Sequence, residues 1–275
     1  MKQKYSVLMS VYAKEKPEFL RKSMMSMYNQ TVPTDDFVLV CDGPLNKKLD
    51  KVIDDMQKKF GNRLRVFKLE ENQGLGLALR FGVKKCKNEL IARMDSDDVS
   101  DKNRMKKELK IFDKMDVDVV GSNIVEYDEK MKTKLTERIV PEDHDDIARM
   151  LKKRNPMNHM TVVFKKSKVL AVGGYKEMLF FEDYYLWARM IDRGYTFYNI
   201  QDNLVSVRGD TGMLKRRGSL EYVACIRNFE YELKTMDIIN PIEYAVNLFA
   251  RCSLALSPVF LRNIVYSNVL RKAPA

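Results

Sequence analysis

The chain has 275 residues, of which 45% are hydrophobic and 32% are charged, and its formal net charge is +11. This hydrophobic fraction is enough for a full core and excludes a disordered polymer, and the length allows one large α/β domain or two small ones. The excess of Lys and Arg over Asp and Glu, 49 against 38, predicts a surface that attracts nucleic acid, anionic lipid or phosphorylated small molecules.

The first hundred residues alternate short apolar runs with stretches of helical period. Polar or turn residues bound the runs, as expected of buried strands, and this alternation is typical of a parallel sheet with crossover helices. The expected strands are Tyr5–Val11, Phe37–Cys41, Leu64–Leu69 and Glu89–Met94, and helices are expected near residues 19–28, 49–60 and 75–83.

The rest of the chain is less regular and predicts a mixed second half. From about Leu214 the pattern is helical, with breaks at Pro241 and Pro258. Before that point we expect a helix near Met105–Phe112, a strand at Val117–Val125, a hairpin around Glu129–Thr133, a helix near Asp145–Lys153, a strand at Thr161–Phe164, a short helix ending at Gly173-Gly174, a helix beginning near Glu182, and strands at Thr196–Ile200 and Leu204–Val207.

The cysteines and the N-terminus point to the cytoplasm. The four cysteines are scattered without a CxxC pair, as buried free thiols are in a reducing compartment. The N-terminal apolar run is too short for a signal peptide, and no run of about 18 apolar residues predicts a spanning helix. We therefore expect a cytoplasmic protein.

Polar groups follow three of the expected strands: Tyr12, Asp42 and the acidic turn Asp95–Asp98. Ligands of open α/β sheets bind beyond the carboxyl ends of the strands. Carboxylates two residues apart, such as Asp95 and Asp97, offer the oxygen ligands that Mg²⁺ and Mn²⁺ prefer. An acidic turn is also a common helix N-cap, a role open to Asp98 or Ser100, and the preceding apolar strand is what favours the metal.

Two further stretches have both a structural and a chemical interpretation. The glycine-rich segment 72–82 lacks the GxGxxG spacing and the P-loop lysine, so its glycines serve either helix–sheet packing or close approach to a ligand. Glu182 and Asp183 lie among aromatic residues at a helix start, where a carboxylate is either an N-cap or a base with a raised pKa. Trp187 is either core or substrate platform. His144 and His159 form no triad with a nearby Ser or Cys.

Taken in order, a set of short motifs resembles the inverting family 2 glycosyltransferases with a GT-A fold. The likeness spans roughly residues 5–210 and looks most like the bacterial enzymes that build exopolysaccharide and O-antigen repeat units. The motifs are Ser10-Val-Tyr12, Gln30-Thr31, Val40-Cys-Asp42-Gly43, Asn72-x-Gly74-x3-Ala78-x3-Gly82, Asp95-x-Asp97-Asp98, Asn158-His159, Gly173-Gly174-Tyr175 and Glu182-Asp183-x-x-Leu186-Trp187.

The resemblance implies a Rossmann-like α/β fold of GT-A type, with a mixed, mainly parallel sheet flanked by helices and a helical C-terminal extension. The catalytic domain would cover residues 1–212, divided near residue 100 into a nucleotide-binding part and an acceptor-side part, and the extension would cover 213–275. The implied activity is transfer of one hexose from a nucleotide-diphosphate sugar, with UDP the expected nucleotide, to a saccharide acceptor that is lipid-linked.

The resemblance also assigns roles to particular residues. Asp183 would be the general base with Glu182 supporting it, Asp97 would ligate Mg²⁺ or Mn²⁺, and Asp95 would contact the ribose or metal-bound water. The nucleotide site would comprise Ser10, Tyr12 on the base face, Asp42 accepting from a base N–H, Asn72, Gly74 and Arg80, the last standing where many members carry Asn. Acceptor or diphosphate contacts fall to His159, Trp187, Arg208 and Arg217.

Several alternatives remain open at this point. A basic segment would either clamp a diphosphate or begin a solvated helix; it consists of Arg208, Lys215, Arg216 and Arg217. The Gln-x-x-Arg-Trp motif of processive enzymes is absent from the sequence, so we expect addition of one sugar per encounter. Apolar and basic residues in 241–272 suit either an anionic membrane surface or packing on the domain.

Two other functions are less consistent with the residues. A sugar-1-phosphate nucleotidyltransferase would need a glycine-rich basic loop after the first strand, where this chain has Ser10-Val-Tyr-Ala-Lys-Glu-Lys. A nucleic-acid-binding protein would show an RNP or zinc-finger signature, and we expect no nucleic-acid partner.

Overall fold

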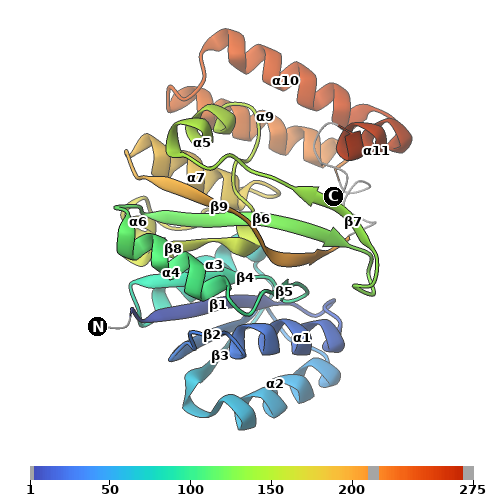
Figure 1. Ribbon diagram of the computed structural model, residues 1–275. Helices are drawn as coiled ribbons and strands as arrows, with labels where there is room; N and C mark the ends of the chain where they lie inside the picture. Colours follow the sequence, from blue (N-terminus) through green and yellow to red (C-terminus); the bar gives the residue numbers. More distant parts are fainter. Residues whose placement is uncertain (1–2, 210–216, 269–275) are drawn as a thin grey trace.

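The computed structural model describes residues 3–209 and 217–268 (Figure 1). Within them, nine strands form one sheet in the order β3-β2-β1-β4-β8-β6-β9-β5, with β7 paired to β6. The strands are β1 (Tyr5–Val11), β2 (Asp36–Cys41), β3 (Leu64–Lys68), β4 (Leu90–Met94), β5 (Val99–Ser100), β6 (Val119–Tyr127), β7 (Lys134–Arg138), β8 (Val163–Lys165) and β9 (Phe197–Arg208). The helices are α1 (Pro17–Tyr28), α2 (Lys47–Phe60), α3 (Leu75–Lys85), α4 (Arg104–Lys114), α5 (His144–Leu151), α6 (Lys166–Ala171), α7 (Glu182–Asp192), α9 (Leu220–Thr235), α10 (Pro241–Leu256) and α11 (Val259–Asn268), with 3-10 turns η1 (Gly61–Arg63) and η2 (His159–Thr161).

The first four strands form the predicted parallel half of the sheet. β1 lies between β2 and β4 and is parallel to both, and β3 is parallel to β2. Alternate residues of β1 enter different cores: Val7 and Met9 pack with α1 and α2, whereas Leu8 packs with α3. Helices on both faces bury β1, β2 and β4, which explains why these strands are nearly continuous apolar runs, whereas the edge strand β3 is only partly buried.

The second half of the sheet is mixed, as predicted. β8 is antiparallel to β4 and to β6, β6 is parallel to β9, and the expected hairpin around Glu129–Thr133 joins β6 to β7. The two strands predicted at 196–200 and 204–207 are wrong as separate elements, because β9 is continuous. Ile200 lies opposite Ser122 and Asn203 opposite Asn123, so the polar residues between them bulge from the ladder instead of forming a turn.

Two other boundaries differ from expectation. Thr161 ends the turn η2, because its backbone N–H is bonded to Asn158 and not to a neighbouring strand, so β8 begins only at Val163. The short strand β5 was not predicted, and it pairs with Val205 and Ser206 of β9. The helical pattern expected from about Leu214 becomes α9 at Leu220, and residues 210–216 lie outside the described part of the chain.

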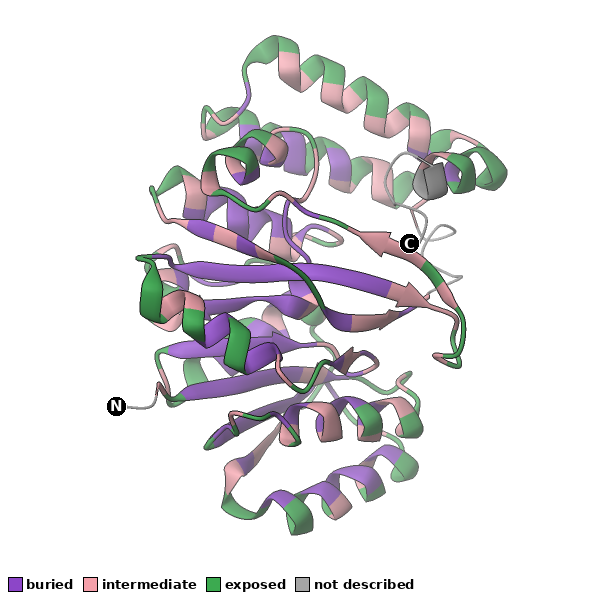
Figure 2. Ribbon diagram, viewed as in Figure 1, coloured by how far each residue is buried: buried purple, intermediate pink, exposed green. Residues whose placement is uncertain are grey.

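The C-terminal helices stack above α7 (Figure 1). α9 joins the core of the domain: Phe229 stacks on Phe181 with ring centroids 4.7 Å apart and planes 7° apart. α10 begins at Pro241 after a capping box on Asn240, and it packs on α9. Figure 2 shows buried strands at the centre and exposed residues along α10. No helix of the described residues is long and apolar enough to cross a membrane.

Candidate functional site

The predicted polar groups do meet at one edge of the sheet. Tyr12, Asp42 and Asp95 follow the neighbouring strands β1, β2 and β4, whose parallel register aligns their carboxyl ends. Tyr12 is exposed, and Ser10, two residues earlier in β1, is half-buried. The arrangement is the one in which α/β sheets bind ligands, and it places an accessible aromatic ring there.

Asp42 ties the end of β2 to the loop that begins α3. Its carboxylate accepts hydrogen bonds from Asn72 Nδ2 at 3.0 Å, from the Gln73 backbone N–H at 2.8 Å and from the Gly74 backbone N–H at 3.0 Å. Gly43 permits this approach, since a Cβ there would lie 2.6 Å from the Asn72 nitrogen. Asp42, Asn72 and Gly74, predicted as parts of one nucleotide site, therefore form one hydrogen-bonded unit.

Arg80 is exposed on α3, one helical face away from that unit. Its Cγ lies 3.7 Å from where a Cβ of Gly174 would stand. Gly174 belongs to the turn before α7 and has a φ of +70°, a conformation that favours glycine. Arg80 thus lies beside the turn that contains Gly174, with its side chain exposed to solvent.

The acidic turn after β4 is organised by Arg93, which sequence analysis did not single out. The Arg93 side chain is 2% exposed and makes a two-pronged ion pair with Asp95, with Nη1 2.5 Å from Oδ2. Such a fork fixes the carboxylate in orientation as well as in charge. Its positive charge also acts on Asp97 and Asp183, whose pKa values it lowers against the larger effect of burial.

Other carboxylates surround Asp97. Burial raises its pKa to about 7, and the charges of Asp95 and Glu15 add to that effect. Glu15 is held in place by the hydroxyl of Ser96. Carboxylates crowded in this way favour either a proton or a cation, and their oxygens suit Mg²⁺ or Mn²⁺.

The donor set is a partial one. Among the residues that the structure describes, no group of three or more His, Cys, Asp or Glu side chains is arranged to hold a metal ion. One or two carboxylates with ligands from substrate phosphate and water is the usual protein contribution to a Mg²⁺ site. Asp97 with Asp95 fits that smaller contribution.

Asp98 does not cap the following helix, which corrects the capping role considered for it. Its carboxylate accepts from the Arg208 backbone N–H at 3.1 Å, and so joins the turn to β9. α4 begins only at Arg104, and Asp101 takes the local role by accepting from the Asn103 backbone N–H at 2.8 Å. Ser100 lies in β5, where its backbone N–H bonds to Ser26 Oγ at 3.1 Å. The acidic turn is therefore built into the sheet.

Arg208 is buried and bound to this same turn. Its Nε donates to the Asp97 carbonyl at 2.7 Å, Nη1 donates to the Glu129 carbonyl at 2.6 Å, and the guanidinium lies 3.9 Å from the centre of the Phe19 ring. Arg208 is therefore held against the acidic turn and is not positioned as a movable clamp for a diphosphate. Its Nη2 is buried without a hydrogen-bond partner, so that nitrogen is the donor left for a ligand. Arg217 is half-buried ahead of α9, and Lys215 and Arg216 lie outside the described residues.

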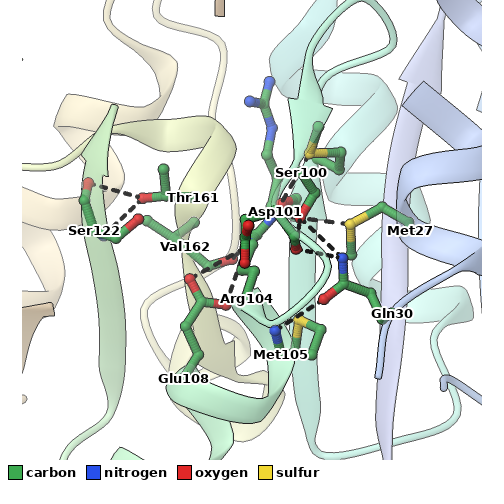
Figure 3. Close-up of polar contacts among 12 residues, drawn as sticks. Met27, Gln30, Ser100, Asp101, Arg104, Met105, Glu108, Ser122, Thr161 and Val162 are labelled. Carbon is green, nitrogen blue, oxygen red and sulfur yellow. Dashed lines mark hydrogen bonds and ion pairs between the residues drawn. The ribbon is translucent and has the colours of Figure 1, made fainter. Parts of the chain in front are cut away.

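Arg104 lies in a buried polar network next to the acidic turn, and Figure 3 shows it with Glu108, Gln30 and Asp101. Its Nε pairs with Glu108, with both side chains fully buried, and its Nη2 donates to the Arg93 carbonyl at 3.0 Å. Gln30 adds a second support, since its Nε2 donates to the Asp101 carbonyl at 2.7 Å and its Oε1 accepts from the Met105 N–H at 3.0 Å. Together they fix the backbone from which Asp95 and Asp97 project.

Glu182 and Asp183 occupy the first two positions of α7, on the opposite side of the site. Burial raises the pKa of both carboxyls, that of Glu182 to about 7. Asn155 Nδ2 donates to Asp183 Oδ2 at 2.7 Å and opposes the rise for Asp183. A half-buried carboxylate with a raised pKa and neutral hydrogen-bond donors is suited to accept a proton.

The backbone before α7 is strained. Phe180 has a φ of +69°, which is rare for a residue with a Cβ, and its ring packs edge-on against Tyr222 of α9 at 5.1 Å. Conformations of this kind persist where the surroundings hold them, and they cluster at functional sites. The C-terminal helix α9 thereby fixes the segment that presents Glu182 and Asp183.

Gly76 lets the two sides of the site come together. A Cβ at this position of α3 would lie 2.9 Å from Glu182 Cγ and 3.1 Å from the Lys176 carbonyl oxygen. The first turn of α3, which follows the Asp42 unit, therefore abuts the first turn of α7. The loop that holds Asp42 and the start of α7 that carries Glu182 therefore lie on neighbouring segments.

His159 and Trp187 are both buried. Trp187 is 0% exposed and His159 is buried, with its Nε2 2.8 Å from the Tyr175 hydroxyl and its ring 6.1 Å from that of Trp187. Burial, with Arg93 nearby, lowers the pKa of His159 well below its usual value, so the ring is neutral. The expected acceptor contacts of both are corrected: Trp187 takes the core role that the sequence left open, because its large ring fills the space beneath α7.

Comparison with known proteins identifies relatives over most of the chain. A profile described as Glycosyl transferase family 2 matches residues 6–172. The UDP-Gal:alpha-D-GlcNAc-diphosphoundecaprenol beta-1,3-galactosyltransferase of Escherichia coli is 34% identical over 270 residues, which cover 98% of this chain and 97% of that protein. The amylovoran biosynthesis glycosyltransferase AmsE of Erwinia amylovora is 37% identical over 222 residues, 80% of this chain and 81% of its own.

Solved structures share the fold at low sequence identity. TarS 1-349 of S. aureus in complex with UDP-GlcNAc superposes with a TM-score of 0.66 at 18% identity, over 96% of this chain and 74% of that one. The mannosyltransferase PcManGT of Pyrobaculum calidifontis, in complex with GDP-Man and Mn²⁺, gives a TM-score of 0.65 at 13% identity, over 98% and 76%. Both have the GT-A fold that the sequence motifs implied.

Proposed function

The chain belongs to glycosyl transferase family 2, and we propose that this glycosyltransferase moves one hexose from a UDP-sugar to a saccharide acceptor with inversion at the anomeric carbon. The observation that carries the proposal is that two carboxylate groups lie around the buried guanidinium of Arg93, whose charge acts on both of them. One group, at Asp95 and Asp97, is crowded and suited to a cation, and the other, at Asp183, is suited to a proton.

The donor side rests on the accessible edge of β1 and β2. Tyr12 offers a ring face on which a nucleobase packs, and Asp42 has lone pairs beyond its three protein hydrogen bonds with which to accept from a base N–H. UDP is the nucleotide we infer, since the name of the E. coli relative specifies UDP-Gal and the TarS structure contains UDP-GlcNAc. Arg80 and the free Nη2 of Arg208 are available to phosphate oxygens.

A divalent ion, Mg²⁺ or Mn²⁺, would stabilise negative charge on the departing diphosphate without a proton donor. Asp97 would hold it, with Asp95 either in its shell or on the ribose. Arg93 keeps Asp95 in one orientation and limits the repulsion among the carboxylates. The buried frame of Arg104 and Gln30 keeps the turn from yielding as the ligand binds.

Asp183 would take the proton of the acceptor hydroxyl. The acceptor oxygen then forms a bond to the anomeric carbon as the bond from that carbon to the diphosphate breaks, and a single displacement inverts the centre. The half-buried position of Asp183 raises its proton affinity, and Asn155 holds its second oxygen aside. Glu182 would steady the adjacent part of the acceptor or donor.

The acceptor we infer is a lipid-linked saccharide used in bacterial surface polysaccharide synthesis. The E. coli relative is named for a diphosphoundecaprenol acceptor, and AmsE is named for amylovoran biosynthesis. Such an acceptor would bring the enzyme to the inner face of the plasma membrane.

Calorimetry with UDP, GDP and dTDP, each with and without Mn²⁺, tests the donor and metal assignments together. It measures the affinity of each nucleotide for the folded protein and the dependence of that affinity on the metal. UDP should bind with Mn²⁺ and lose at least about tenfold in affinity when EDTA replaces the metal. Transfer from UDP-Gal to GlcNAc-diphosphoundecaprenol should release UDP. Release of pyrophosphate instead would identify a nucleotidyltransferase and refute the proposal.

A further inference from the structure

The outer face of α10 is apolar, which is the reverse of the usual surface helix. After Pro241, the exposed positions recur at helical spacing and carry no charge: Ile242, Ala245, Val246, Phe249, Ala250, Ser253 and Leu256. Ile242 is 75% exposed and Phe249 is 77% exposed. A continuous apolar stripe of this kind marks a surface that is covered by something else.

Arg251 and Asn247 of α10 point inward. Arg251 pairs with Glu230 at 2.8 Å and also donates to the Lys153 carbonyl at 2.8 Å, while Asn247 donates to the Lys152 carbonyl at 2.7 Å. These contacts fix the rotation of the helix about its axis. The apolar stripe therefore faces out because the inner face is bound to α9 and to the end of α5.

The stripe continues onto α11. Phe260 is 62% exposed, and Val259 and Leu261 beside it are also exposed. Arg262, the basic residue of this helix, is turned inward and donates to the Ala255 carbonyl at 3.4 Å. The two helices thus present one apolar surface at the end of the molecule remote from β3 (Figure 1), which we call the α10–α11 face.

We propose that the α10–α11 face inserts into the interfacial layer of an anionic lipid membrane. The occupant is argued from charge: a net charge of +11 repels a second copy of the chain and attracts anionic headgroups. Lys153 and Lys234 are exposed beside α10, where headgroups would lie if the apolar stripe were immersed. The choice of lipid also rests on the proposed lipid-linked acceptor.

The same face is connected to the catalytic side. Arg251 donates to the Tyr184 hydroxyl at 3.2 Å, and Tyr184 follows Asp183 in α7. Lys153 lies two residues before Asn155, which holds Asp183. A helix seated in the membrane would keep the base at a set height above the headgroups, where the diphosphate of a lipid-linked acceptor lies.

Flotation with vesicles tests the proposal without donor or acceptor. The purified protein should float with vesicles of phosphatidylethanolamine and phosphatidylglycerol, and Phe249→Glu should lower the bound fraction about tenfold, since it places a charge at the depth of the apolar face. Phe249→Leu should bind as the unaltered protein does. Met115→Glu changes an exposed apolar residue that directly follows α4, away from this face, and should have no effect.

Two results would overturn the proposal. One is the absence of vesicle binding by the unaltered protein. The other is a dimer in light scattering that Phe249→Glu converts to a monomer, which would make the face a contact between copies. Transfer to a water-soluble GlcNAc-diphosphate acceptor should be unchanged in Phe249→Glu, and failure of the unaltered protein in that assay would count against the proposed reaction, not against the membrane face.

Discussion

The two acidic clusters of the site differ in what holds them. The turn after β4 contains Asp95 and Asp97 beside a buried guanidinium, that of Arg93, and its backbone is fixed by Arg104. At the start of α7, Asp183 is held by the neutral amide of Asn155. Burial raises carboxyl pKa values in both places, but only the first cluster gathers several carboxylates around one point.

The two environments would suit carboxylates to two different roles, metal binding and proton transfer. Crowded carboxylates repel one another, and a divalent cation relieves that repulsion more effectively than a single proton. A carboxylate held by neutral donors has no such demand, and the burial that raises its pKa makes it a better proton acceptor. On the proposed assignment, the surroundings of each carboxylate, rather than its residue type, would separate the metal ligand from the base.

The largest expected effect comes from Asp183→Asn. The amide keeps the shape and the hydrogen-bonding capacity of the side chain but cannot accept the proton, so transfer should fall about 10³- to 10⁴-fold. Steady-state transfer kinetics and calorimetry with UDP measure the two sides separately. UDP affinity should be unchanged, and turnover near that of the unaltered enzyme would remove Asp183 from the role of base.

Asp97→Ala should act on the other cluster, with a loss of about 10²- to 10³-fold in transfer. UDP binding should lose its dependence on Mn²⁺, which a titration with and without EDTA will show. The fold should remain, because the carboxylate destabilises its own surroundings when no cation is bound. UDP affinity that still responds to EDTA would mean that another residue holds the metal.

Arg93→Met tests whether the buried guanidinium positions Asp95. We expect about 10- to 100-fold weaker metal-dependent UDP binding, the usual range for residues that orient metal ligands. Arg93→Lys keeps the charge without the fork and should fall between the two. If Arg93→Met and Arg93→Lys raised the KM for the donor equally and left kcat unchanged, the charge of Arg93 would not be what positions Asp95.

Asn155→Ala should have the smallest effect and the opposite signature. The hydrogen bond from Asn155 lowers the pKa of Asp183, so its loss raises that pKa further. A base works only when deprotonated, so activity falls on the acid side, and the acid limb of kcat/KM should move to higher pH by about one unit. At high pH the variant should approach the unaltered enzyme. An acid limb that stays in place would separate Asn155 from the base.

The sequence predicted the donor side better than the acceptor side because parallel strands bring their ends together by topology. Residues that follow β1, β2 and β4 had to meet, and Tyr12, Asp42 and Asp95 do. Asn155 reaches Asp183 through packing of a loop on a helix 28 residues away, and no local pattern encodes that contact.

Arg93 could have been found from the sequence. A charged residue within the apolar run that begins at Leu90 must be paired if the strand is buried, and Asp95 is the nearest partner on the same side of the chain. The role of Asp98 was not accessible in this way. Its partner is the backbone of Arg208, 110 residues later, and the local sequence resembles a helix cap.

The contact of Gly76 with Glu182 has a consequence for how this site changes over time. The close approach of the first turn of α3 to the first turn of α7 depends on the missing side chain of Gly76, since a Cβ there would lie 2.9 Å from Glu182 Cγ. Loops around the site can lengthen or exchange residues to suit another sugar while this spacing stays the same. A side chain at Gly76 would press on Glu182 and on the Lys176 carbonyl oxygen, so the spacing of α3 and α7 is less free to vary than the loops around them.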